Sequence, residues 1–169
     1  MSNDIVKRQE QRYFQKIGEN LQTIVKELLK NQTLLRYLCY TDMEPLSLNK
    51  PNINPSDVLH EQIRMIPVIG NKEEATSIVT VRLLEAAVQV ENPEFVEVYL
   101  DLEIFVPNTQ WILKADNLRP YLIMGEINRS LNMKKINGLG DIVFDLAKIN
   151  FITEELTCYK MVFHITQFN

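Results

Sequence analysis

Apolar residues recur every three or four positions near the start of the chain, which gathers them on one face of a helix. These positions are Phe14, Ile17, Leu21, Ile24, Val25 and Leu28. Charged residues fill the positions between them, and Asn31 is placed to end the helix. Residues 33–40 then predict a short second helix. We therefore expect residues 1–40 to form two helices whose apolar face packs against a sheet.

The periodicity stops over residues 41–62, where Pro45, Pro51 and Pro55 favour turns. Irregular connections of about 20 residues are uncommon inside compact domains and are usually functional or mobile. This one is also apolar in places, and we interpret it as an extended arm that touches a neighbouring chain. The residues that would make the contact are Leu46, Leu48, Ile53 and Leu59.

Alternation of apolar and polar residues then predicts five strands, at 63–69, 77–90, 95–106, 142–151 and 157–168. The apolar phase slips by one residue near Leu84 and Glu85, which indicates a β-bulge. The strand at 95–106 has the clearest pattern. One of its faces is apolar, and the other carries Glu97, Tyr99, Asp101 and Glu103.

A third helix is expected before the last two strands, capped by Asp116 or Asn117, with Pro120 in its first turn and Leu131 near its end. The fold class is then α+β, in a single domain spanning residues 1–169. It comprises the helices of 1–40, the arm of 41–62, and the sheet with its inserted helix at 63–169. We expect a mostly antiparallel five-stranded sheet, with the long N-terminal helix and one further helix packed on one face.

Composition narrows the classes of function that the protein can have. The 18 basic and 22 acidic residues give a formal net charge of −4, whereas proteins that grip nucleic acid are usually basic. We expect passive contact with DNA at most. No apolar run is long enough to cross a membrane. Cys39 and Cys158 both lie in apolar segments and are expected to be small buried side chains in a reducing compartment.

The motifs of catalysis and cofactor binding are absent, so we expect neither an enzyme nor a cofactor. Gly138-Leu139-Gly140 precedes a strand instead of opening a helix, which predicts a turn. His60 has no second histidine at the spacing of a zinc motif. Three acids on one strand, Glu97, Asp101 and Glu103, could serve acid–base chemistry or bind a hard cation. A solvated sheet face or a subunit contact is the interpretation we favour.

Trp111, the single tryptophan, lies in a turn. Two roles remain open for it, a plug over the core or an anchor for a partner.

Three segments have a familiar pattern: 118–128 (LRPYLIMGEIN), 137–140 (NGLG) and 158–169 (CYKMVFHITQFN). Together they resemble structural proteins at the head–tail junction, or neck, of tailed bacteriophages, with the tail-terminator or tail-completion proteins nearest. The resemblance covers mainly residues 95–169 and rests on packing motifs. It implies a homo-oligomeric ring, of six subunits or alternatively twelve, with no catalytic residues. Such a ring terminates the tail, joins it to the connector and lets DNA pass.

We therefore expect a structural protein of the virion, assembled in the cytoplasm of the host bacterium, whose partners are other neck, connector and tail-tube proteins. The expected subunit contacts are Leu46, Leu48, Ile53, Leu59, Glu97, Tyr99, Asp101, Glu103 and Trp111. Two other classes of function remain open. One is a monomeric metal-dependent enzyme or small-ligand domain that uses the acidic strand face. The other is an adaptor that binds a protein.

Overall fold

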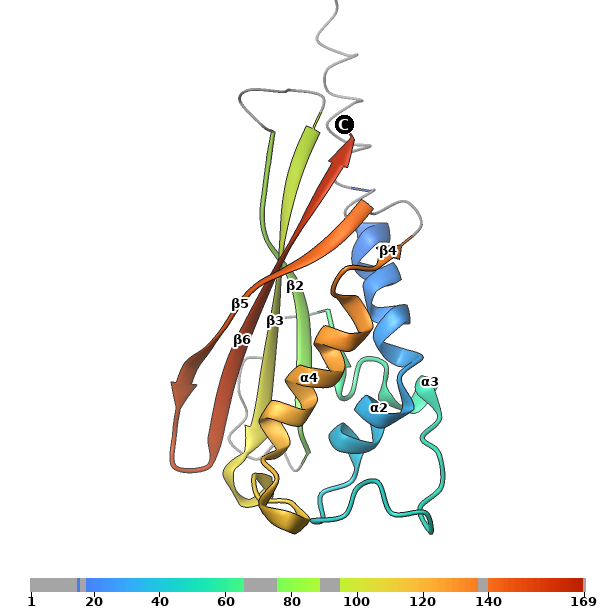
Figure 1. Cartoon of the computed structure of the whole chain (residues 1–169), viewed down its shortest axis with the longest axis vertical. Coiled ribbons are helices and arrows are strands. Elements are labelled where there is room, and N and C mark those ends of the chain that lie inside the picture. Colours follow the sequence, from blue (N-terminus) through green and yellow to red (C-terminus); the bar gives the residue numbers. More distant parts are fainter. Residues whose placement is uncertain (1–14, 16–17, 66–75, 89–94, 137–139, 169) are drawn as a thin grey trace, which may run out of the picture.

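The computed structural model describes residues 15, 18–65, 76–88, 95–136 and 140–168. Its centre is a curled six-stranded sheet in the order β1-β2-β3-β6-β5-β4. Figure 1 shows the helices on one side of this sheet. The strands are β1 (Ile63–Arg64), β2 (Ile78–Val88), β3 (Phe95–Pro107), β4 (Lys135–Ile136), β5 (Gly140–Ile152) and β6 (Leu156–Phe168).

The two central strands, β3 and β6, pair antiparallel along their whole lengths. Their alternation sends one set of side chains toward the helices, where Leu100, Leu102 and Phe163 are almost wholly buried. The register between β2 and β3 shifts between Leu83 and Glu85. The bulge predicted from the slip in apolar phase is therefore confirmed.

The helical layer consists of residues 18–29, α2 (Gln32–Cys39) and α4 (Arg119–Leu131). Asn31 separates the first two helices. Its side chain accepts a hydrogen bond from the backbone N–H of Leu34 at 3.1 Å and donates to Glu126 Oε2 at 2.8 Å and to Ser130 Oγ at 2.9 Å, both on α4. One side chain therefore caps α2 and joins it to α4. The apolar faces of these helices form the core with the sheet.

Residues 41–62 do not extend from the molecule as an arm, because they fold back onto the helices, and their contact with a neighbouring chain stays a prediction. Gln32 Nε2 donates to the carbonyl of Ile53 at 2.7 Å, and the guanidinium of Arg36 donates to the carbonyl of Ser47. The segment also contains a short helix, α3 (Pro55–Val58), whose last residue is fully buried. Prolines and asparagines therefore mark turns here, while the buried apolar residues between them hold the segment in place.

Arg119, at the start of α4, ties this loop to the rest of the molecule. Its guanidinium is fully buried and donates only to backbone carbonyls. The acceptors are Gln110 at 2.8 Å, Tyr37 at 2.7 Å, and Tyr40 and Asp42, each at 2.6 Å. Burial lowers the pKa of Arg119, and the nearby Asp42 carboxylate opposes that change. The carbonyls at and beyond the end of α2, which lack partners within the helix, are thereby satisfied.

Three further expectations need correction. The sheet has six strands in place of five, and β1 runs parallel to β2. Of the strand predicted at 63–69, only Ile63–Arg64 is a described strand, and residues 66–69 lie outside the described residues. Helix α4 is preceded by Leu118, which makes no side-chain cap, in place of Asp116 or Asn117. Those residues instead belong to a tight turn in which Asp116 has a φ of 57°.

Replacing Arg119 by methionine should lower the free energy of unfolding by about 3 kcal/mol, because buried carbonyl groups would lose their donor. Urea denaturation followed by circular dichroism measures this change. Arg129→Met is the matched control, since Arg129 is exposed and pairs only with Glu126. It should change stability by less than about 1 kcal/mol. Equal effects of the two substitutions would contradict the role assigned to Arg119.

Candidate interaction surface

The sheet face turned away from the helices carries a charged cluster that crosses three strands. Arg82 on β2 lies 2.6 Å from Asp101 and 2.6 Å from Glu103, both on β3. Lys160 on β6 lies 3.1 Å from Asp101. Asn150 on β5 donates to Glu103 at 2.9 Å. Cross-strand register explains the arrangement, because Arg82 pairs with Asp101, and Glu103 with Lys160, as neighbouring residues.

This cluster corrects the expectation of an open acidic face. Two cations balance the two acids, and Asp101 is only 2% exposed. Burial by itself would lower the pKa of Arg82, but the hydrogen bond and charge of Asp101, with those of Glu103, raise it above its ordinary value. Among the described residues, no group of three histidines, cysteines or acids is placed to hold a metal ion. The pairing partners Arg82 and Lys160 were missed because they lie on other strands, and the cross-strand register was unknown.

The remaining residues of the predicted interface divide into exposed and packed positions. Leu48 is 99% exposed and Leu46 is 40% exposed. Ile53 and Leu59 instead pack against the core. The hydroxyl of Tyr99 donates to Glu97 at 3.1 Å on the same strand, and the Tyr99 ring lies 6.3 Å from that of His164.

Trp111 is half-buried and packs against the core, with its ring 6.1 Å from that of Tyr159. Of the two roles left open for it, this contact favours the plug. The structure thus brings Asp101 and Glu103 together and leaves Leu46, Leu48 and Trp111 at other places in the fold.

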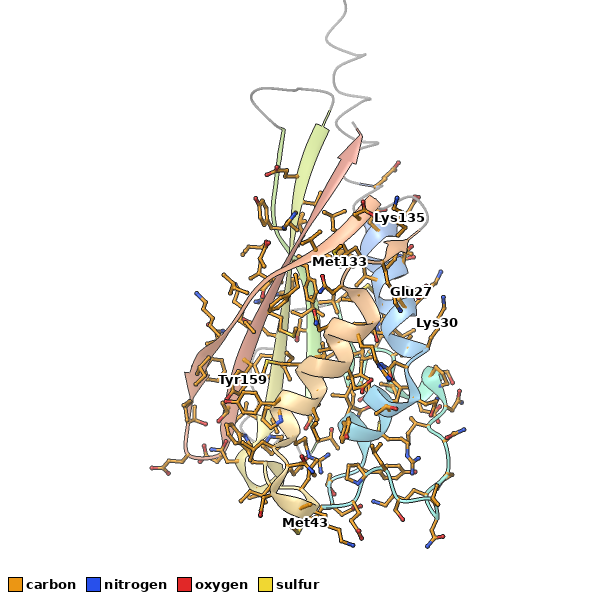
Figure 2. All side chains as sticks on the ribbon, in the orientation of Figure 1. Glu27, Lys30, Met43, Met133, Lys135 and Tyr159 are labelled. Atoms are coloured by element: carbon orange, nitrogen blue, oxygen red, sulfur yellow. The ribbon has the colours of Figure 1, made fainter. Side chains whose placement is uncertain are left out.

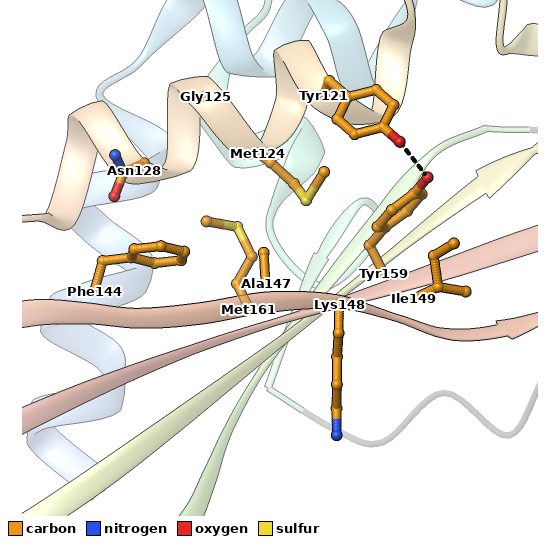
Figure 3. A pocket seen from close by; sticks show the side chains of 10 residues that line it. All are labelled: Tyr121, Met124, Gly125, Asn128, Phe144, Ala147, Lys148, Ile149, Tyr159 and Met161. Carbon is orange, nitrogen blue, oxygen red and sulfur yellow. Dashed lines mark hydrogen bonds between the residues drawn. The ribbon is translucent and has the colours of Figure 1, made fainter.

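An apolar groove lies between α4 and β5 and has a volume of about 470 Å³. Figure 3 shows Met124 and Tyr121 reaching toward the sheet from α4, opposite Met161 and Tyr159 of β6. The hydroxyl of Tyr159 donates to that of Tyr121 at 3.1 Å. Burial, together with this hydrogen bond, raises the pKa of Tyr159 to about 12. The β5 side of the groove is formed by Phe144, Ala147 and Ile149, with Lys148 pointing away.

The outer edge of β5 beside this groove is largely open. Strand β4 pairs with β5 only at Gly140 and Asp141, and the backbone N–H of Phe144 donates to the side chain of Asn132 at 3.0 Å. Beyond that point, no strand in the described part of the chain pairs with the outer side of β5. The exposed apolar residues of the strand are Leu146, Ile149, Phe151 and Ile152, which are 43%, 50%, 40% and 62% exposed.

Open apolar edges of this kind are places where another chain can pair. We call the groove and this edge together the β5 surface. Sequence reasoning missed it, although one signal was present: residues 142–152 are apolar on both faces of a strand, a pattern that is unusual when one face meets solvent.

The model of the YomW family matches residues 31–165 of this chain. The chain belongs to the YomW family. This family is phage-derived and Bacillus prophage-like, so the resemblance to phage proteins is supported at that level. No curated protein matches the chain. The YomW match runs from Asn31 into β6, so the β5 surface, the charged cluster and Arg119 all lie within it.

Both cysteines of this YomW protein are free thiols, and of the two only Cys158 is buried, whereas Cys39 is half-buried. Within the described residues, no helix combines the length and the apolar character needed to cross a membrane.

Replacing Arg82 by methionine should lower the free energy of unfolding by about 2 kcal/mol, because Asp101 is buried and would keep only Lys160 as its partner. Chemical denaturation measures the change. Arg129→Met on α4 is the matched control, since Arg129 is exposed and pairs with Glu126 at the surface, and it should leave the unfolding midpoint almost unchanged. If Arg82→Met left the free energy of unfolding unchanged, Arg82 and its ion pairs would contribute nothing to stability.

Both thiols should resist labelling by a disulfide reagent at pH 8. Burial, followed by the charge of Asp57, raises the pKa of Cys39 to about 11, and burial, followed by the charge of Glu103, raises that of Cys158 to about 12. The thiolate is the reactive form. Absorbance of the released thiol should therefore rise only after urea is added. Rapid labelling of both thiols in the native protein would contradict the half-buried position of Cys39 and the buried position of Cys158.

Proposed function

We propose that this protein is a structural component of a phage particle that assembles as a ring at the head–tail junction, where it terminates the tail and joins it to the connector. Its membership of a phage-derived family supports a particle protein. The resemblance of its helix, turn and last strand to neck proteins supports this position in the particle.

The observation that carries the proposal is that the chain exposes two separate apolar surfaces on different sides. One is the β5 surface. The other is the loop of residues 42–50, which presents Leu46 and Leu48 to solvent. Figure 1 shows the end of β5 at the lower left of the molecule and this loop at the lower right. A closed assembly of more than two chains needs at least two contact surfaces on each copy, and the two exposed apolar surfaces support such an assembly.

The loop is held firmly enough to act as a contact surface. Within it, the N–H of Ser47 donates to the carbonyl of Glu44, and that of Lys50 to Ser47, each at 3.1 Å. Lys50 also forms an ion pair with Asp42, and Lys114 forms one with Glu44 at 2.6 Å. A preorganised loop loses little conformational freedom when it binds. Figure 2 shows Met43, which is 55% exposed, at the same end of the molecule.

A metal-dependent enzyme is the alternative from another class, and the ion pairs weigh against it. Asp101 and Glu103 already share Arg82 and Lys160. A divalent cation at these acids would have to displace two fixed positive charges. The ring is therefore the function that we retain.

The full-length protein should form a discrete species of six or twelve subunits, which native mass spectrometry over a concentration series would measure and electron microscopy would show as a ring. Leu48→Asp should shift this species toward smaller masses, because a charge would be buried in the contact. Met133→Asp is the control, since Met133 is 75% exposed and its side chain belongs to neither surface. The protein should also be present in purified particles, and its absence from them would contradict the proposal.

A further inference from the structure

The open part of β5 is a short regular strand between two bulges. The register with β6 shifts between Phe144 and Leu146 and again between Ile149 and Phe151. Between the shifts, Leu146, Ala147 and Lys148 pair with consecutive residues of β6. Bulges limit strand addition, so regular backbone pairing along this edge is centred on residues 146–149, with the residues at the bulges contributing side chains only.

The two faces of this short segment differ. Ala147 and Ile149 lie on the groove side, toward α4. On the other face, Lys148 lies opposite Lys160, and Asp145 lies 2.6 Å from His164. Lys160 and His164 alternate along β6, so Asp145 and Lys148 share that face.

Two copies of this segment placed antiparallel have complementary charges, because the acid of each copy lies near the lysine of the other. Within its own chain, Lys148 faces a like charge, Lys160, and no ion pair joins it to another described residue. A second copy of β5 running antiparallel would bring its acidic residue to the basic residue of the first, and the reverse. Opposite charges placed across strands stabilise a pair, and they also fix its register.

We propose that the β5 surface pairs with the β5 surface of a second copy, as two antiparallel edge strands related by a two-fold axis at Ala147. In this register Ala147 faces its own copy, and Leu146 faces Lys148. Asp145, bulged beside Leu146 on the same face, then lies next to Lys148 of the second copy. On the groove side, Ile149 meets Phe144 of the second copy, so the two apolar grooves join.

The small side chain at the centre suits this contact. Ala147 is exposed and carries only a methyl group, so the two backbones can approach to hydrogen-bonding distance. The segment contains no proline, which would remove a backbone donor. Ile149, 50% exposed in one chain, becomes covered.

The inference rests on the proposed function and deepens it, because it assigns the β5 surface, one of the two surfaces needed for a ring, to a two-fold contact. The loop of residues 42–50 then has to join the β5 dimers into the ring. Loss of the β5 contact therefore breaks a ring into smaller species, and where no ring forms it turns dimers into monomers.

Cysteine cross-linking tests the contact at its axis. Opposed residues of antiparallel strands have Cα atoms about 4.5–5.5 Å apart, which is within the range that a disulfide spans. The Ala147→Cys protein should therefore form a covalent dimer under mild oxidation, visible on a non-reducing gel. Met133→Cys is the control and should stay uncrosslinked. Of the two native thiols, Cys39 is half-buried and Cys158 is buried, and the Met133→Cys control reports any cross-linking through them. Absence of the Ala147→Cys dimer in concentrated protein would overturn the proposal.

A charge-swap series tests the register. Lys148→Glu should weaken the pairing at least tenfold in analytical ultracentrifugation, because it sets a carboxylate against Asp145 of the second copy. Asp145→Lys should weaken it as well, and the double variant should regain most of the loss. Ile149→Asp should lower the native mass of the assembly while circular dichroism stays unchanged. If the double variant paired no more tightly than either single variant, this register would be overturned.

The two proposals fail differently. A ring whose mass does not respond to Ile149→Asp and whose Ala147→Cys form does not cross-link overturns the β5 pairing and leaves the ring standing. A β5 dimer that never forms a larger species, in solution or in particles, supports the pairing and overturns the ring.

Discussion

The buried guanidinium of Arg119 organises the helical side of this protein. A single side chain collects four backbone carbonyls, from the turn after β3, from the last residues of α2 and from the loop that follows. Planar geometry and five donors make arginine suited to this task, whereas lysine offers only a point charge. This contact fixes the start of the loop of residues 42–50 at Asp42, and Arg36 and two ion pairs hold the rest. The packing motif that first indicated a family resemblance thus has a structural role.

The two faces of the sheet have different roles. The helix-facing side forms the core, and its aliphatic residues set the register of the strands. The opposite side is crossed by ion pairs that leave the acids neutralised and largely buried. Within this cluster the two cations leave little net charge with which to recognise a ligand. Recognition is left to the margins of the molecule, where β5 and the loop expose apolar residues.

The sequence carried enough information to predict most of the secondary structure, because the long elements have strong periodicity. The bulge near Leu84 and the helix of α4 were both visible in the order of apolar residues. The predictions that failed concern very short elements or contacts between residues that are distant in the sequence. A two-residue strand such as β4 leaves no periodic pattern, and a loop of prolines and asparagines does not reveal that Arg119, far along the chain, will fold it inward.

The candidate site shows the same division. Asp101 and Glu103 were correctly placed on one face of a strand, yet their exposure depended on Arg82 and Lys160, which only the sheet order brings to them. The openness of the β5 edge depends equally on which strands lie beside it, because the same apolar sequence would be ordinary in the middle of a sheet.

The central pairing of β3 with β6 also has a consequence for biosynthesis. These strands are separated by the whole of α4 and β5, and contacts so distant along the chain form slowly. On the ribosome, the helices and the β2–β3 hairpin emerge well before β6 does. During that interval β3 has one unoccupied edge, so the nascent chain passes through a stage in which a chaperone or a stray strand can bind where β6 belongs.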